Sequence, residues 1–160
     1  PTFADTTGKQ LADSGVSINQ LTAPPYCEVR NSSSQTTSNG TWVSINFDTE
    51  IADTDSMHDN VTNPSRITCK TPGVYLIIGS AEFATNSDGF RVGAIAKNGT
   101  RIVFASSGVV PWPSGTTPFN VSVVTKLKLN DYVQLQAYQS SGGNLNIENT
   151  AFFSAIRLSD

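Results

Sequence analysis

The feature that most constrains the fold is an unbroken apolar run near the middle of the chain. Residues 74–78 (VYLII) are five consecutive apolar residues, and they follow a Pro72-Gly73 turn. A strand of an antiparallel sheet with one wet face alternates apolar and polar residues, because successive side chains point to opposite faces. This run does not alternate, so we expect both of its faces to be buried. One face can enter the core of the domain, and a second copy of the chain is the simplest cover for the other.

The chain after Pro25 has the pattern of short strands separated by turns. The expected strands are 26–30, 41–47, 67–69, 74–85, 90–97, 101–105, 119–129, 132–138, 145–147 and 151–158. The polar segments 31–40 and 48–65 are expected to be loops, and Asn98-Gly99 is the strongest hairpin signal. About ten short strands with this spacing and no helical stretch predict an all-β fold, a β-sandwich or jelly roll of antiparallel strands.

The last expected strand ends almost at Asp160. An exposed edge strand can pair with other chains, so proteins usually cover their edges. We therefore expect the C-terminal strand to lie between other strands and to pair with the first strand, 26–30.

The chain divides into two parts of different composition. Residues 1–24 contain few apolar side chains and several Gly, Ser and Pro residues, which predicts an N-terminal arm or tether. Residues 25–160 are enough for one domain with its own core, and we expect them to form the head.

Charge is sparse in this chain. Charged residues make up 14% of the sequence, the net charge is −3 and the ten basic residues are scattered. Ordinary globular domains carry about 25% charged residues. This pattern argues against a nucleic-acid partner. No apolar stretch approaches the roughly 20 residues of a membrane-spanning helix, so we expect no membrane partner either.

The two cysteines, Cys27 and Cys69, both fall in expected strands. A disulfide between them and two separate buried thiols both fit this placement, since a reduced cysteine packs as a small apolar residue. The buried thiols are the simpler interpretation.

Four stretches of the chain form an ordered set of motifs. They are 68–75 (TCKTPGVY), 96–99 (AKNG), 127–135 (LKLNDYVQL) and 152–158 (FFSAIRL). Together they resemble the globular head of the complement component 1q family, which shares a jelly roll with tumour necrosis factor. The resemblance covers residues 25–160 and implies a compact homotrimer. Asn130 stands where the family has Gly, a replacement that Asn tolerates because it adopts positive φ more readily than most residues.

The N-terminal arm carries a second resemblance. The segment 7–18 (TGKQLADSGVSI) is similar to linkers of bacteriophage fibre proteins. Phage-encoded heads of the complement 1q type also carry stretches like 46–50 (NFDTE) and 53–59 (DTDSMHD). This resemblance implies a protein of a bacteriophage virion.

The sequence contains no recognisable catalytic set. Its single histidine, His58, has Ser56 and Asp59 close by in the acidic segment 48–65. A catalytic triad needs a nucleophile, a base and an orienting acid in mutual contact, which a solvated loop does not provide. No phosphate-binding or zinc-protease motif occurs either. We expect no enzymatic activity and no cofactor.

The same segment holds the candidate metal ligands. The carboxylates Glu50, Asp53, Asp55 and Asp59 could bind calcium, which takes six to eight oxygen ligands. Their spacing lacks the glycine and terminal glutamate of an EF-hand loop, so a solvated acidic loop is the favoured interpretation. Some relatives in the resembled family bind calcium near the trimer axis, which keeps Asp53, Asp55 and Asp59 as the calcium candidate.

Trp112, between Pro111 and Pro113, is the best candidate for an exposed binding residue. Flanking prolines stiffen a loop and lower the entropy cost of presenting an aromatic ring. The alternatives are that the ring closes the end of the sandwich or packs between subunits. The residues expected as core or trimer contacts are Tyr75, Ile77, Phe83, Tyr132, Phe152 and Phe153.

Together these observations predict a non-enzymatic, homotrimeric surface protein of a bacteriophage virion. Residues 1–24 would attach to other virion proteins, and the head would stabilise the particle or bind a host-surface glycan or protein. If Pro1 follows a removed initiator Met, a capsid-decorating protein or head fibre is expected; if it is a trimmed end, the tip of a tail fibre is expected. The alternative is a secreted, extracellular, lectin-like binding module of the complement 1q type.

Overall fold

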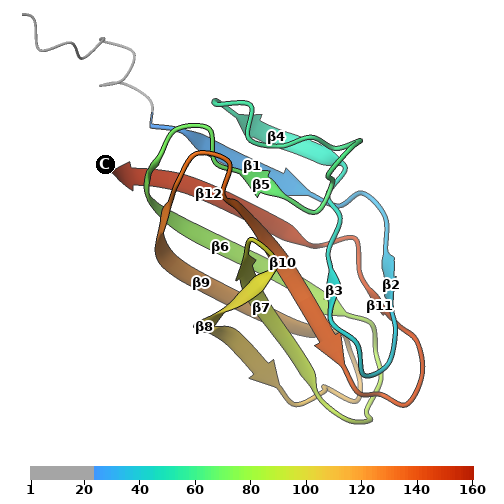
Figure 1. The fold of residues 1–160 in the computed structure, drawn as a ribbon. Coiled ribbons are helices and arrows are strands. Elements are labelled where there is room, and N and C mark those ends of the chain that lie inside the picture. The colour runs from blue at the N-terminus through green and yellow to red at the C-terminus, as the bar shows by residue number, and fades with distance from the viewer. Residues whose placement is uncertain (1–23) are drawn as a thin grey trace, which may run out of the picture.

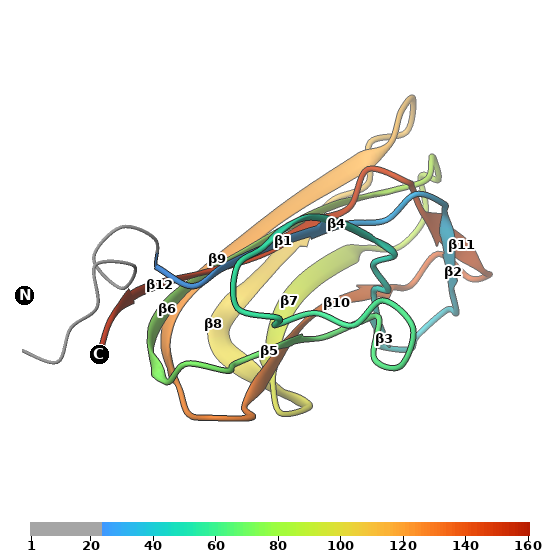
Figure 2. The same ribbon diagram turned by 90° about the horizontal axis from the view of Figure 1, so that it is seen from above.

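The computed structural model describes residues 24–160, which form two antiparallel β-sheets packed face to face (Figures 1 and 2). The strands are β1 Tyr26–Arg30, β2 Gln35–Thr37, β3 Val43–Ser44, β4 Thr49–Asp53, β5 Ile67–Thr68, β6 Gly73–Phe83, β7 Arg91–Lys97, β8 Thr100–Val109, β9 Thr117–Leu127, β10 Tyr132–Gln139, β11 Leu145–Ile147 and β12 Phe152–Ser159. This part of the chain holds no helix that is long and apolar enough to cross a membrane. The expected all-β sandwich is confirmed. The arm expected at residues 1–24 lies outside the described residues apart from Pro24.

The first sheet has seven strands and is centred on β6. Along one edge β6 pairs with β9 over its whole length, from Gly73 opposite Leu127 to Phe83 opposite Thr117. Along its other edge β6 pairs with β12 and then, at Phe83, with β11. β1 and β4 extend the sheet beyond β12, and β2 extends it beyond β11. The apolar strand that stood out in the sequence is therefore the axis of this sheet.

The second sheet has five strands, in the order β3-β10-β7-β8 with β5 paired to the start of β10. β7 and β8 form a hairpin whose turn residues, Asn98 and Gly99, have φ values of 50° and 79°. This is the hairpin that the Asn-Gly pair predicted. The register shifts between Ala94 and Ala96 of β7, and Phe104 on the facing part of β8 has a φ of 69°. β8 therefore carries a bulge at this point.

The C-terminal strand lies inside the first sheet. β12 runs between β6 and β1, and Phe153 is opposite Val29 on one side and Gly79 on the other. The expected pairing with the first strand is thus confirmed. Ladders on both sides leave β12 with no free edge.

Two strands lie where the sequence indicated loops. β4 falls within 48–65 and β2 within 31–40, whereas the strand expected at 41–47 is reduced to the two residues of β3. β4 is exposed over most of its length and pairs with β1 through a ladder that shifts register after Glu28. Backbone pairing satisfies the polar groups of such a strand without much side-chain burial, so the sequence shows no alternating pattern there.

The core fills the space between the two sheets. Phe47, just before β4, stacks on Phe153 of β12 with ring centroids 5.7 Å apart. Phe83 of β6 meets Phe119 of β9 with centroids 5.7 Å apart and the rings tilted. All four rings are buried. Aromatic pairs at this separation add to the stabilisation that burial provides.

The two faces of β6 have different surroundings. Tyr75 and Ile77 point inward and are fully buried. Leu76 and Ile78 point outward; Leu76 is half-buried and Ile78 is 36% exposed. We expected both faces of this run to be buried. Among residues 24–160 only the inward face is fully covered, because the other strands of the sheet lie beside β6 and not over it.

Both cysteines are buried as separate thiols. Cys27 on β1 and Cys69 after β5 are fully buried and unpaired. Burial raises the pKa of each thiol above its ordinary value, since the thiolate would lose its hydration. Both side chains therefore stay protonated and pack as small apolar groups.

Gly93→Ala should destabilise the fold, because Gly93 on β7 faces the ring of Phe119 and an added Cβ would overlap that ring. Phe83 contacts the same ring, so it cannot move away without disturbing the core. We expect the free energy of unfolding to fall by about 1–3 kcal/mol in urea denaturation. Gly143→Ala is the control, since an added Cβ there meets nothing within 4 Å and should change stability by less than about 0.5 kcal/mol. Equal stability of the two variants would contradict this packing.

Candidate functional site

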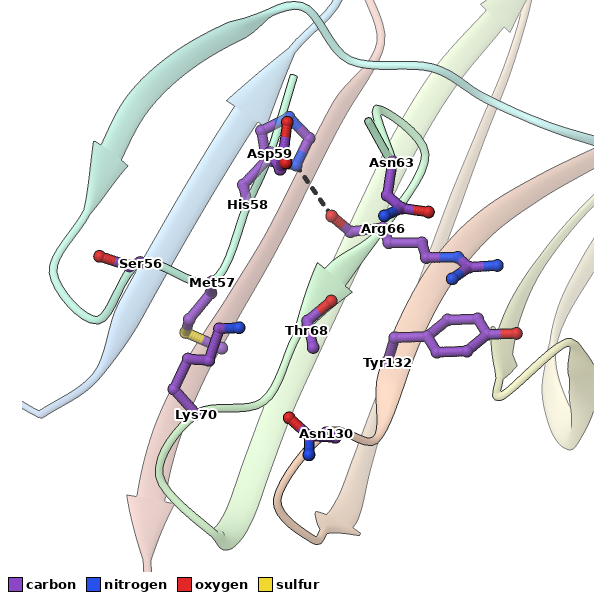
Figure 3. A pocket seen from close by; sticks show the side chains of 10 residues that line it. All are labelled: Ser56, Met57, His58, Asp59, Asn63, Arg66, Thr68, Lys70, Asn130 and Tyr132. Atoms are coloured by element: carbon purple, nitrogen blue, oxygen red, sulfur yellow. Dashed lines mark hydrogen bonds between the residues drawn. The ribbon is translucent and has the colours of Figure 1, made fainter. Parts of the chain in front are cut away.

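A polar hollow of about 280 Å³ lies beside β5 and the loop that precedes β10 (Figure 3). One wall is the turn from Ser56 to Asp59, the second is β5 with its flanking residues, and the third is the loop at Asn130. Most of the side chains around it carry hydroxyl, amide or charged groups. A hollow of this composition suits a hydrophilic ligand and not an apolar one.

The Asp53 carboxylate stabilises the turn that forms the first wall. Its Oδ1 accepts hydrogen bonds from the N–H groups of Asp55 and Met57, at 3.2 and 3.0 Å. Its Oδ2 accepts one from the N–H of His58 at 2.9 Å. The turn that results places Ser56 at a φ of 52° and on the rim of the hollow.

The ring of His58 ties this turn to the rest of the protein. Its Nδ1 lies 2.8 Å from the carbonyl oxygen of Arg66, and its Nε2 lies 3.2 Å from that of Phe47. Both ring nitrogens are thus engaged with backbone, and neither Ser56 nor Asp59 contacts the ring through a hydrogen bond. The three neighbours in sequence do not form a catalytic triad, because no nucleophile meets the base.

Strand β5 directs alternate side chains into the hollow and into the core. Ile67 and Cys69 are fully buried, whereas Arg66, Thr68 and Lys70 border the hollow. The division follows from strand geometry, in which successive side chains point to opposite faces. The core-facing residues therefore fix the direction of the polar ones.

Arg66 is held in place by an aromatic ring. Its guanidinium carbon lies 4.0 Å from the centroid of the Tyr132 ring, at the side of the hollow shown in Figure 3. Tyr132 is opposite Thr68 in the ladder between β10 and β5. A cation stacked on an aromatic face is stabilised, and the N–H groups on the edge of the guanidinium stay free to bind another molecule.

The Asp131 carboxylate stabilises the loop that forms the third wall. It accepts hydrogen bonds from the Asn98 side chain at 2.7 Å and from the Lys128 N–H at 2.8 Å. It also forms an ion pair with Lys97, whose Nζ is 2.9 Å away. These contacts, that of Asn98 first, lower the pKa of Asp131 to about 2. The network fixes the loop that brings Asn130 to the hollow.

Several polar side chains around the hollow are free to bind a ligand. Those that make no side-chain hydrogen bond or ion pair within residues 24–160 are Ser56, Asn63, Arg66, Thr68, Lys70 and Asn130. They border one hollow from different sides, with Lys70 on one side of β5 and the Arg66 guanidinium on the other, beside Tyr132 (Figure 3). The arrangement can bind a polar molecule, and it offers no nucleophile with an adjacent base.

The calcium candidates do not converge on one point. Asp53 is occupied by the backbone of its own turn, and Oδ1 of Asp59 accepts hydrogen bonds from the N–H groups of Val61 and Thr62, both at 2.9 Å. These backbone hydrogen bonds lower the pKa of Asp59. Over residues 24–160, no three His, Cys, Asp or Glu side chains are grouped to hold a metal ion. Asp53, Asp55 and Asp59 therefore do not assemble the calcium site considered from the sequence.

The Trp112 loop lies at the other end of β9 from the Asn130 loop, since it precedes the strand that Asn130 follows. Pro111 is buried, whereas Trp112 is 62% exposed. The backbone N–H of Trp112 donates to Thr117 Oγ1 at 3.0 Å, and the indole ring packs against Gly115. The loop is thus internally bonded and presents an aromatic ring on the surface. It shares no residue with the hollow.

The residues predicted as core or trimer contacts fall into two groups. Fully buried in the core are Tyr75, Ile77, Phe83 and Phe153. Phe152 and Tyr132 are only half-buried, and Tyr132 borders the hollow. The sequence analysis did not single out Arg66 or Lys70. The signal for them was their alternation with two buried residues on a short strand.

A row of apolar side chains crosses the outward face of the first sheet. Side by side on four neighbouring strands lie Val124 of β9, Leu76 of β6, Ile156 of β12 and Tyr26 of β1. Val124 is 57% exposed, and Ile78, two residues along β6, is 36% exposed. We call these residues the apolar row. A contiguous apolar strip on the surface of a single chain marks an interaction surface.

Solved structures share this fold at low sequence identity. The globular domain of zebrafish complement 1qA protein aligns with a TM-score of 0.60 and 18% identity, over 85% of this chain and 99% of that chain. Murine APRIL gives a TM-score of 0.64 and 10% identity, over 84% and 99%. Eiger TNF from S. frugiperda gives 0.64 and 12%, over 86% and 94%. No protein-family model and no curated protein sequence matches the chain.

Identities this low establish the fold alone. The chain is a jelly roll of the complement 1q and tumour necrosis factor type, as the four motifs implied. The predicted resemblance is confirmed at the level of the fold.

Asp131→Asn should remove an acid-sensitive part of the stability. The pKa of Asp131 in the folded protein is about 2, below the roughly 3.9 of an unfolded aspartate. Its ionised form therefore stabilises the native state above a pH of about 4, and this contribution is lost as the pH falls through about 2. Urea unfolding midpoints measured across this pH window should fall less steeply in the variant than in the wild type.

Asp88→Asn is the control for this experiment, because it removes an exposed carboxylate near the other end of β7. It should keep the wild-type pH dependence. If Asp131→Asn also keeps it, the network around Asp131 does not stabilise the loop as described.

Proposed function

We propose that this chain is a non-enzymatic, homotrimeric surface protein whose heads associate through the outward face of the first sheet. The observation that carries the proposal is the apolar row of Val124, Leu76, Ile156 and Tyr26. Each Å² of apolar surface removed from water stabilises an assembly by about 25 cal/mol. A neighbouring copy that covers the row therefore gains free energy in proportion to the area buried.

A closed ring of copies satisfies this requirement. When one copy packs a different surface against the row of the next, the contact is heterologous, and it closes if the rotation between copies is right. Three copies around one axis would then each cover the row of a neighbour. The motif resemblance to the complement 1q family implies a trimer, and the shared jelly roll supports that number.

A binding or structural role suits the described residues better than catalysis does. Both ring nitrogens of His58 face backbone carbonyl oxygens, those of Arg66 and Phe47, and no hydroxyl or thiol of the described residues is hydrogen-bonded to them. The thiols of Cys27 and Cys69 are buried and protonated. These groups therefore supply neither a base nor a nucleophile at the surface.

We place the trimer on a bacteriophage virion, as a capsid-decorating protein, a head fibre or a tail-fibre tip. The support is the similarity of residues 7–18 to linkers of phage fibre proteins. In this proposal residues 1–24 bind other virion proteins, and the three arms act together so that each attachment can be weak. The heads face outward, where they stabilise the particle or bind the host.

The second candidate is a secreted, lectin-like module of the complement 1q type. The fold neighbours favour it, since the complement 1qA, APRIL and Eiger TNF proteins come from zebrafish, mouse and S. frugiperda. Under this candidate the trimer acts outside the cell and binds a glycan or protein without any particle.

Val124→Glu should convert the trimer to monomers. Val124 is 57% exposed in the single chain, so a charged side chain is tolerated there by the fold but not within an apolar interface. Val61→Glu is the matched control, because Val61 is 85% exposed on a loop outside the apolar row. Native mass spectrometry should give three chains for the wild type and the control, and one for Val124→Glu. A wild type that stays monomeric at micromolar concentration would contradict the proposed assembly.

Deleting residues 1–24 should separate attachment from folding. The head should keep its trimeric mass and its unfolding midpoint, because β1 begins at Tyr26. Particles assembled with the truncated chain should lack it after density-gradient purification and immunoblotting. Retained heads would move attachment to residues 25–160. Absence of the full-length chain from particles would favour the secreted candidate.

A further inference from the structure

Two positively charged side chains border the polar hollow. Arg66 and Lys70 border it, and neither forms an ion pair with any residue from 24 to 160. Arg30, Lys97 and Arg157 form ion pairs, whereas Arg101, Lys126 and Lys128 are unpaired within that range but do not border the hollow. The chain as a whole carries a net charge of −3, so two unpaired cations at one hollow form a local site for an anion.

Asp59 is the one acidic residue among those that line the hollow. Asp59 borders the hollow, but its Oδ1 accepts hydrogen bonds from the backbone of its own turn, and no ion pair joins it to Arg66 or Lys70. These hydrogen bonds keep Asp59 ionised, so the lining carries two positive charges, from Arg66 and Lys70, against one negative charge. This sign attracts an anionic ligand and repels a metal cation.

The geometry of Arg66 favours a carboxylate. Its guanidinium is stacked on the Tyr132 ring at 4.0 Å, so its orientation is fixed before any ligand arrives. Tyr132 is anchored in turn, since its N–H donates to Asn98 Oδ1 at 2.9 Å. A guanidinium fixed in this way offers two parallel N–H groups to the two oxygens of one carboxylate. Little side-chain freedom then has to be lost on binding.

The remaining walls are suited to hydroxyl groups. Ser56, Asn63, Thr68 and Asn130 have free side-chain hydroxyls or amides around the same hollow. Each of these groups can both donate and accept hydrogen bonds, as the hydroxyls of a sugar ring require. A small inorganic anion would satisfy the two cations and leave these four groups without a function.

The size of the hollow limits the ligand. Its volume of about 280 Å³ is at the lower end of the roughly 300–1,000 Å³ of small-molecule sites. One sugar residue is therefore a better match than a longer chain fully enclosed by the protein. Further residues of a glycan would extend into solvent.

We propose that this hollow binds one carboxylated sugar residue of an acidic glycan, with Arg66 on the carboxylate and Lys70, Ser56, Asn63, Thr68 and Asn130 supplying donors and acceptors for the ring hydroxyls. The site belongs to β5, β10 and their loops, on the second sheet, whereas the apolar row crosses the first sheet. Binding therefore does not require the trimer. The monomeric Val124→Glu variant should bind as the wild type does, which separates failure of this inference from failure of the proposed assembly.

The test is a titration of the ¹⁵N-labelled full chain followed by NMR. The probes are glucuronate, galacturonate and N-acetylneuraminate, with glucose and inorganic phosphate for comparison. We expect at least one acidic sugar to cause saturable shifts in the amides of residues 56–70 and 128–132, with a dissociation constant in the millimolar range. Added salt should weaken this binding, because it depends on a charge pair near the surface.

Arg66→Gln and Lys70→Gln should each weaken binding of that sugar by about tenfold or more. Lys128→Gln is the control, since it removes the same charge from an exposed residue that does not border the hollow. The spectra themselves show whether each variant is folded. Lys70→Gln keeps the test decisive if Arg66→Gln disturbs the fold, because Lys70 makes no side-chain hydrogen bond within the described residues.

Four outcomes would overturn the proposal. Glucose binding as tightly as the acidic sugars would exclude a role for the carboxylate. Phosphate binding as tightly would exclude a role for the sugar ring. Unchanged affinity in both Gln variants, or no saturable shift with any of the three acidic sugars, would exclude the site.

Discussion

The structure depends on the pairing of β6 with a strand on each of its edges. β9 and β12 occupy these edges, so the backbone of the most apolar strand is satisfied inside the first sheet. Its inward side chains, such as Tyr75 and Ile77, then form the centre of the core. Within residues 24–160 the outward side chains are only partly covered, because the neighbouring strands lie in the plane of the sheet. The arrangement that secures the core therefore also creates the apolar row, on which the proposed assembly depends.

The sequence was most informative where burial imposes a regular pattern. β9 was predicted within two residues at each end, because its inward residues, among them Phe119 and Val121, alternate with polar ones. β4 and β2 were predicted as loops because backbone pairing, not burial, holds them. β8 was expected to end at Ala105 but continues to Val109, beyond the bulge at Phe104. Ser106 to Gly108 have no apolar alternation, and their pairing with β7 depends on a register shift that one sequence does not reveal.

The candidate site was harder to predict, for a physical reason. From the sequence, Asp53 and Asp59 were candidate metal ligands, because carboxylates are the usual ligands of calcium. In the structure both accept backbone N–H groups and so shape their own loop, as Asp131 does in another loop. The groups left free are cations, amides and hydroxyls, whose role depends on convergence from three separate segments. The one signal that the sequence offers for Arg66 and Lys70 is their alternation with the apolar residues Ile67 and Cys69. It indicates a shared face, but not which residues of the Asn130 loop lie opposite.

The apolar row and the polar hollow lie on different sheets of the head. The first sheet turns an apolar face outward, which is costly in a single chain and favours association. The second sheet carries the hollow, whose mostly polar lining can stay hydrated and open to solvent at little cost. If the copies associate through the first sheet, each keeps its hollow exposed, and three equivalent sites surround one axis. A carboxylate on a single sugar residue gives only a weak interaction with two surface cations. Three such sites on a glycan-covered surface act at high effective concentration, so the assembly multiplies the affinity that one head lacks. In the proposed assembly, association through the apolar row would bring three hollows together, and this would raise the avidity of the assembly for the glycan.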